Sequence, residues 1–184
     1  VADAPRPDPC GARGAWVEWE SPTSEDLNDV IVAGGEAVIV GAHGTVLPWD
    51  GVAWYAQDAA TRENIAAIWI DGRGAGWFPT TAGLSRLEGE GWRAQPRPPL
   101  PGISVLLAVW GRAPDDVWFG GGSVTPRVGL HARWDGTAIA LVGGEPTGVQ
   151  VLELRGSEDA RAIWSLSQAG HVAQLPEPGR AEAG

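Results

Sequence analysis

Residues 106–120 read LLAVWGRAPDDVWFG, and this stretch decides the fold. It contains two short apolar runs, LLAVW and VWFG, separated by GRAPDD. Runs this short that contain valine and aromatic residues favour strands over helices. Gly, Pro and Asp are typical of tight turns. The stretch therefore predicts two antiparallel strands joined by a turn.

The same pattern recurs along the chain. Shifting residues 30–54 by 38 positions places Val30 on Ile68 and Trp54 on Trp92 without a gap. A third copy follows at an offset of 41, with Trp110 and Trp118 matching Trp69 and Trp77, and a weaker fourth copy ends the series. Three or four strands in each repeat of about 40 residues are typical of a β-propeller blade. The sequence predicts an all-β fold, a β-propeller of four blades.

The tripeptide Trp-Asp-Gly occurs at 49–51 and at 134–136. An Asp-Gly step readily adopts the positive φ angles that a two-residue hairpin turn requires. Each tripeptide therefore predicts a hairpin.

The segments AVWGRAPDDVWFGGG, GTVLPWDGVAW and GLHARWDG resemble the repeats of bacterial β-propeller proteins of the Asp-box or BNR-like kind, whose blades carry a D-G-x-x-W turn. The third copy departs from this motif because Ile139 replaces the final Trp. The resemblance covers residues 27 to 175 and implies the propeller fold. Because the family includes sialidases, assembly factors and sorting receptors, it does not imply one chemistry.

We expect residues 1–14 to be a flexible leader and residues 177–184 a tail. Residues 15–176 are expected to form one propeller domain with repeats at about 27–64, 65–102, 103–148 and 149–176. GAWVEWE at 14–20 resembles the outermost strands GVAWYAQ and GEGWRAQ, whereas the last copy lacks such a strand. We therefore expect residues 15–20 to pair with residues 171–175, so that an N-terminal strand completes the last blade and closes the ring.

Charge narrows the range of partners. All 13 basic residues are arginine, and they oppose 23 acidic residues for a net charge of −10. Such a surface repels nucleic acid and anionic lipid, and no apolar run is long enough to span a membrane. The lone Cys10 cannot form a disulfide within the chain. A Trp-rich, acidic chain without lysine and with a Pro-rich leader is expected to be periplasmic or extracellular.

The sequence offers little for catalysis or metal binding. His43, His131 and His171 occupy different positions in their repeats, so a zinc site is not expected. Asp115 and Asp116 are expected to accept hydrogen bonds from backbone amides in a turn. The only tyrosine, Tyr55, lies on an outermost strand, where it cannot act as a sialidase nucleophile. We expect no enzyme activity and no cofactor.

The 11 tryptophans form two main classes. Those expected to pack between blades are Trp69, Trp77, Trp110, Trp118 and Trp164. Those beside the hairpins, which lock neighbouring blades together or form exposed platforms, are Trp49, Trp54, Trp92 and Trp134. Trp49 and Trp134 are the candidate platforms, since tryptophan is enriched in binding hot spots.

These features favour a non-catalytic protein-interaction or scaffold module, an accessory subunit of an envelope or secreted assembly. The third copy has six extra residues within Gly120–Gly129, which predict a loop. Loops that break a repeat often carry binding function, so Val124, Arg127 and Val128 are the candidate contacts with a partner protein. The alternative is a carbohydrate-binding propeller, in which sugars stack on tryptophans at repeated sites.

Overall fold

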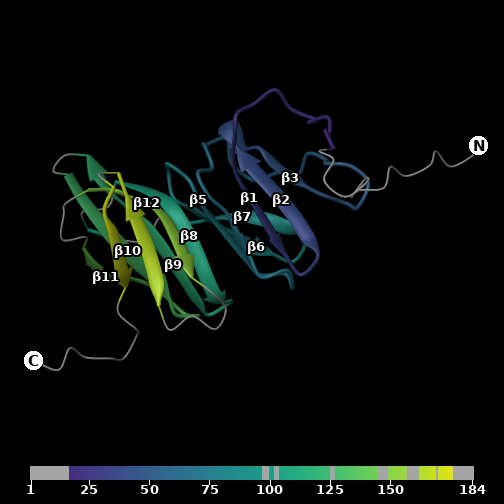
Figure 1. Ribbon diagram of the computed structural model, residues 1–184. Coiled ribbons are helices and arrows are strands. Elements are labelled where there is room, and N and C mark those ends of the chain that lie inside the picture. The colour runs from purple at the N-terminus through teal and green to yellow at the C-terminus, as the bar shows by residue number, and fades with distance from the viewer. Residues whose placement is uncertain are drawn as a thin grey trace, which may run out of the picture.

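The computed structural model describes residues 17–96, 100–101, 104–124, 127–144, 149–156, 162–168 and 170–175. These residues form antiparallel β-sheets, as the repeat pattern predicts (Figure 1). The expected leader, residues 1–14, and the expected tail, residues 177–184, lie outside this part of the chain. In the described residues, no helix is long and apolar enough to cross a membrane.

The strands form four sheets, each built from consecutive strands. The first sheet contains β1 (Leu27–Ala33), β2 (Glu36–Gly41) and β3 (Val46–Pro48), with a 3₁₀ turn, η1 (Ala42–Gly44), between the last two. The second contains β4 (Trp69–Ile70), β5 (Gly76–Pro79), β6 (Leu84–Glu88) and β7 (Gly91–Gln95). The third contains β8 (Val105–Ala113), β9 (Asp116–Val124), β10 (Arg127–Trp134) and β11 (Ile139–Gly144). The fourth contains β12 (Val151–Gly156), β13 (Ile163–Ser167) and β14 (Val172–Leu175).

The sheets follow one another in chain order. Their first strands are neighbours, with β1 beside β4, β4 beside β8 and β8 beside β12. The first sheet continues beyond β3, because the backbone amides of Tyr55 and Gln57 donate to the carbonyls of Pro48 and Val46. Residues 54–57 therefore act as an irregular fourth strand of the first sheet.

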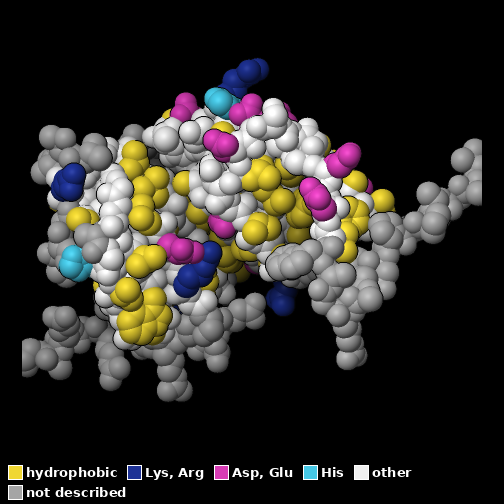
Figure 2. Space-filling model, turned by 45° about the horizontal axis from the view of Figure 1, so that its top comes forward, with side chains coloured by type: hydrophobic (Ala, Val, Ile, Leu, Met, Phe, Trp, Pro, Cys, Tyr) yellow, Lys and Arg dark blue, Asp and Glu magenta, His cyan; other side chains and the backbone are white. Residues whose placement is uncertain are grey.

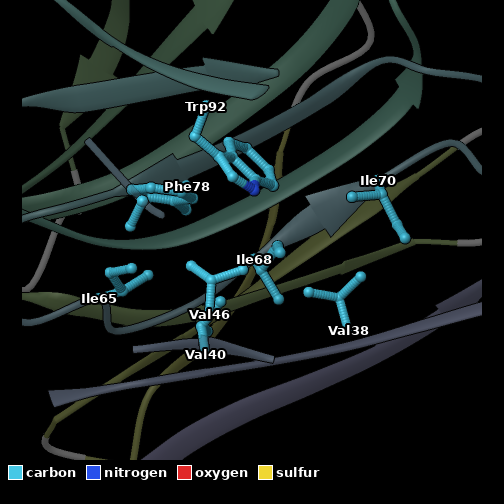
Figure 3. Packing of buried hydrophobic residues seen from close by; sticks show 9 residues of the cluster. Val38, Val40, Val46, Ile65, Ile68, Ile70, Phe78 and Trp92 are labelled. Carbon is cyan, nitrogen blue, oxygen red and sulfur yellow. The ribbon is translucent and has the colours of Figure 1, made fainter. Parts of the chain in front are cut away.

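A hydrophobic core lies between each pair of successive sheets, because alternate side chains of a strand point to opposite faces. Between the first and second sheets, side chains from both sheets point toward one another (Figure 3). The core between the second and third sheets includes Trp69, Trp77, Val109, Val117 and Phe119. The core between the third and fourth sheets contains Ala108, Trp110, Trp118, Val151, Leu154, Ile163 and Leu175. Four of the five tryptophans expected between blades lie in these last two cores, namely Trp69, Trp77, Trp110 and Trp118.

Glycines allow the first two sheets to approach at their first hairpins. Gly34 and Gly72 have φ angles of 60° and 67°, and a Cβ atom on Gly34 would lie 2.6 Å from the Gly72 carbonyl oxygen. Only glycine fits both the backbone angle and the space. The two hairpins therefore touch through their backbones.

The loop expected at Gly120–Gly129 is wrong, because most of it is strand. β9 and β10 continue their pairing through Gly129 with Gly122 and Val128 with Ser123, up to Arg127 with Val124. The glycines fit a crowded strand pair: a Cβ atom on Gly122 would collide with the carbonyl oxygen of Val128. The extra residues therefore lengthen a hairpin.

The expected closure of the last blade is not observed. Residues 17–20 form no strand, and the Trp19 ring packs edge-on against Trp49 of the first sheet at 4.7 Å between centroids. In the described part of the chain β14 pairs with β13 alone. The purple residues before β1 and the yellow fourth sheet lie on opposite sides of Figure 1. The expected burial of Trp164 between blades is also wrong, because Trp164 is exposed on the outer face of the fourth sheet.

Candidate functional site

The predicted contact residues lie near the tip of the β9–β10 hairpin. Arg127 is exposed and Val128 is half-buried, and Val124 pairs with Arg127 through the backbone. The structure therefore brings the three residues together. Arg127 and Val128 line none of the three clefts described below.

Trp134, one candidate platform, lies between the second and third sheets. Its ring centroid is 5.4 Å from that of Trp77, and the Arg86 guanidinium lies 5.1 Å from the Trp134 centroid. The Trp134 Nε1 donates to the Pro114 carbonyl at 3.1 Å. The residue is half-buried in this packing.

Trp49, the other candidate platform, lines a cleft of about 290 Å³ between the first and second sheets, which we call the Trp49 cleft. The Trp49 ring is half-buried and packs on Trp54 at 5.2 Å. The lining residues are Glu36, Ala37, Val38, Pro48, Trp49, Tyr55, Gln57, Ile70, Gly74, Leu87, Gly89, Glu90 and Trp92. Tyr55 is exposed, so the cleft has an aromatic side open to solvent.

The Trp49 cleft and the packing around Trp134 are corresponding parts of the repeat. Across β5 and β6, Trp77 pairs with Arg86, and across β2 and β3, Val38 pairs with Pro48. In the second and third sheets the Trp77 and Trp134 rings pack on each other, and the guanidinium of Arg86 lies against both, 5.4 and 5.1 Å from their centroids.

In the first and second sheets that arginine is replaced by a shorter side chain. Pro48 stands 38 residues before Arg86, Leu87 takes the repeat position of Trp134, and both line the Trp49 cleft. The chain therefore fills one such space with its own arginine and leaves the other open.

The electrostatics of the Trp49 cleft favour a cation. Glu36 and Glu90 line it, and no basic residue is present among its described lining residues. Gln57 fixes one wall by donating from Nε2 to the Glu90 carbonyl at 3.1 Å. We did not expect Glu36, Glu90 or Gln57 from the sequence, because surface carboxylates are common in an acidic chain. The signal that does identify the cleft is the replacement of Arg86 by Pro48 in the repeat.

Asp116 has a structural role that differs from the expected one. Its carboxylate accepts hydrogen bonds from Trp118 Nε1 at 2.9 Å and from Arg133 Nε at 2.6 Å, and Arg112 lies 3.4 Å away. The donors are side chains, whereas backbone amides were expected. The ion pair holds the Arg133 guanidinium 5.8 Å from the Trp118 ring centroid.

The Asp-Gly turns are also structural. In the first turn, Asp50 Oδ1 accepts the backbone amides of Val52 and Ala53 at 2.7 and 2.8 Å. In the second, the amide of Ala138 and the hydroxyl and amide of Thr137 donate to Asp135. These hydrogen bonds stabilise the carboxylate and lower the pKa of Asp135 from 3.8 to about 2.

Two further clefts occur. One of about 130 Å³ lies among the first strands of the sheets and is lined in part by Asn28, Asp29 and Arg155. The other, of about 350 Å³, lies among the first hairpins and includes Asp71, Arg73 and Arg112. No group of three His, Cys, Asp or Glu residues in the described ranges is placed to hold a metal ion.

No family model and no curated protein matches this chain. Among solved structures, YCF48 bound to D1 peptide is similar with a TM-score of 0.66 and 17% identity, over 88% of this chain and 54% of that one. The computationally designed Ika4 protein has a TM-score of 0.61 and 16% identity, over 86% and 95%. Streptogramin B lyase has a TM-score of 0.61 and 14% identity, over 90% and 59%.

This chain therefore spans little more than half of the YCF48 and lyase chains. Identities this low show the fold alone. They support a β-propeller and do not identify the Asp-box kind in particular. Together with the four antiparallel sheets, they show that the chain has the β-propeller fold.

Proposed function

We propose that the protein is a non-catalytic binding module that holds a basic side chain of a partner protein in the Trp49 cleft. The observation that carries this proposal is the arginine that the repeat itself uses. Arg86 lies against both the Trp77 and Trp134 rings, and the corresponding space beside Pro48 is open. A guanidinium from a partner has the size and charge to occupy it.

The chemistry of the cleft suits an arginine or lysine. A cation over an aromatic face contributes about 0.5–2 kcal/mol, more where water is excluded. Trp49, Tyr55 and Trp92 supply aromatic surface, and Glu36 and Glu90 supply negative charge. The net charge of −10 also attracts a basic partner over longer distances.

Two further observations support a protein partner and a binding role. YCF48, which has the same fold, is solved with a D1 peptide bound. The carboxylate of Asp116, the one buried aspartate in the described part of the chain, is occupied by structural donors. We extend the proposal to an accessory subunit of a periplasmic or extracellular assembly. The tip residues Val124, Arg127 and Val128 are its second proposed contact surface.

The experiment is a titration of the full chain with a short arginine-containing peptide, followed by tryptophan fluorescence. We expect binding that weakens as salt rises and that is lost when the peptide arginine is replaced by glutamine. Pro48→Arg should abolish binding, because the new arginine fills the cleft as Arg86 fills its counterpart. The matched control is Leu141→Arg, which adds the same charge at an exposed position on β11. Equal binding by Pro48→Arg and the control would exclude the cleft.

A carbohydrate ligand is the second candidate, because Gln57 and Glu90 lie beside the aromatic side of the cleft. Lectin propellers of this kind need the same polar residues in several blades. Here Gln57 donates to Glu90 of the next sheet, whereas Gln95, its repeat counterpart, donates to Glu88 of its own sheet. The polar arrangement is not repeated, which favours a protein partner. Binding of the chain to one sugar class on a glycan array, abolished by Tyr55→Ala, would reverse this ranking.

A further inference from the structure

The two end sheets expose positions that are buried in the middle of the molecule. Val30 on β1 is 58% exposed, whereas its repeat counterparts Ile68, Val109 and Leu154 are 2%, 2% and 1% exposed. Each counterpart packs against the sheet that precedes it in the chain. In the part of the chain that the structure describes, no sheet precedes the first one, so this face is open.

The fourth sheet is open on its opposite face. Trp77, Trp118 and Trp164 are counterparts in the repeat. Each pairs with the corresponding residue of the first strand of its sheet, namely Trp69, Trp110 and Arg155. Trp77 and Trp118 are 2% and 1% exposed, and Trp164 is 49% exposed. Exposed apolar neighbours on this sheet are Leu152, Leu166 and Val172. Figure 2 shows hydrophobic side chains at the surface in separate patches among charged ones.

In the described residues the fourth sheet also lacks the outermost strand that the other sheets have. The second and third sheets end in β7 and β11, and residues 54–57 extend the first. In the described residues nothing pairs with the outer edge of β14. An unpaired edge of this kind is a template for a strand from elsewhere.

Residues 17–20 lie beside the first sheet, where the outermost strand of a preceding sheet would lie. Trp19 stands 38 residues before Gln57, and Trp49 stands 38 residues before Leu87. Gln57, in the outermost strand of the first sheet, reaches the second sheet beside Leu87 in the Trp49 cleft. The Trp19 ring contacts Trp49 in the corresponding way, at 4.7 Å. Residues 17–20 therefore sit against the first sheet as the outermost strand of a preceding sheet would.

We propose that a second copy of this chain completes the ring. The fourth sheet of one copy packs on the open face of the first sheet of the other, and its β14 pairs with residues 17–20 of that other copy. Because the arrangement is reciprocal, a two-fold axis gives two identical interfaces and eight sheets. Each interface repeats the packing that joins successive sheets three times within the chain.

A second copy suits these faces for two reasons. The open faces carry aliphatic and aromatic side chains at repeat positions that are buried at the internal interfaces. A second copy that covers these faces removes their apolar surface from water. The charged residues of the fourth-sheet face, Glu153 and Arg155, pair with each other at 2.6 Å and so add no net charge to it.

The test measures the mass of the full chain in solution by light scattering after size exclusion. We expect twice 19.2 kDa. Val32→Glu, which disrupts the first-sheet face, and Trp164→Glu, which disrupts the fourth-sheet face, should each give monomers with unchanged circular dichroism. The matched control is Leu141→Glu on β11, which should remain a dimer. A wild-type monomer, or dimers of both face variants, would overturn the proposal.

Mixing the two variants sharpens the test. Val32→Glu keeps the fourth-sheet face and Trp164→Glu keeps the first-sheet face, so an equimolar mixture should regain dimers through one intact interface. In a Cys10→Ser background, Glu18→Cys with Gln174→Cys should oxidise to a species of dimer size on a denaturing gel. A cross-link within one chain would show that residues 17–20 close the ring of their own copy and would overturn the proposal.

Discussion

The second and third sheets pack around an arginine of the chain, whereas the first and second sheets leave the corresponding space open. Arg86 lies against the Trp77 and Trp134 rings in the first case, and Pro48 and Leu87 line the Trp49 cleft in the second. Both interfaces nevertheless keep a buried core of similar composition. The comparison teaches that a repeat can keep its fold while exchanging a few side chains near its rim, and thereby convert packing into a binding space.

The largest effect is expected at the tryptophan that supports the filled interface. Trp77→Ala removes a ring that is almost fully buried and contacts Phe119 and Trp134. Removal of a buried aromatic side chain costs about 3–5 kcal/mol of unfolding free energy. Urea denaturation measures this loss. Leu141→Ala, at an exposed position on β11, is the control and should change stability by about 0.5 kcal/mol at most.

A smaller effect is expected at the arginine itself. Arg86→Ala removes the cation from two aromatic faces and should cost about 1–2 kcal/mol. It also opens a space like the Trp49 cleft between the second and third sheets, so the variant should bind free guanidinium-containing peptides at a second site. Arg93→Ala is the matched control, because that side chain is mostly exposed and its ion pair in the described residues is with Glu88 at 3.5 Å. Equal losses of unfolding free energy in the two variants would mean that the contact of the Arg86 cation with the two rings does not stabilise the fold.

The smallest effect is expected at the turn that leads away from Trp134. The pKa of Asp135 is lowered to about 2 in the folded state, so the ionised carboxylate stabilises the fold above pH 4. This contribution is lost as the pH falls from about 4 to about 2. Asp135→Asn should therefore lower the thermal midpoint slightly at pH 7, and the difference from wild type should vanish near pH 2. If the difference in thermal midpoint between Asp135→Asn and wild type persists at pH 2, it comes from the hydrogen bonds of the turn and not from the charge of the carboxylate.

Most of the fold could be predicted from the sequence, because the repeat carries it. The match of Val30 with Ile68 and Val109 identifies the first strand of three sheets, and the Asp-Gly steps identify two hairpins. The six extra residues of the third copy were misread as a loop, since an insertion in a repeat can equally lengthen a strand pair. Only the neighbouring strand decides between the two, as Gly122 against Val128 shows.

The candidate site was less predictable. Trp49 could be named from its position beside a hairpin, but Trp134, which has the same position, is covered by Arg86. The difference depends on a residue of the neighbouring sheet, which pattern matching within one repeat does not consider. Trp164 was misassigned for a similar reason, because its repeat position is buried only where a following sheet exists. Burial in this fold is a property of the interface between sheets.

The strand order has a consequence for folding kinetics. Every strand in the described chain pairs with a neighbour in sequence, so each sheet can form from one contiguous segment at a small cost in loop closure. The third sheet has the longest described strands, β8 and β9, so we expect it to form first. Substitutions there should slow folding, whereas substitutions in the fourth sheet should mainly speed unfolding. The molecule should grow outward from its third sheet, one neighbour at a time.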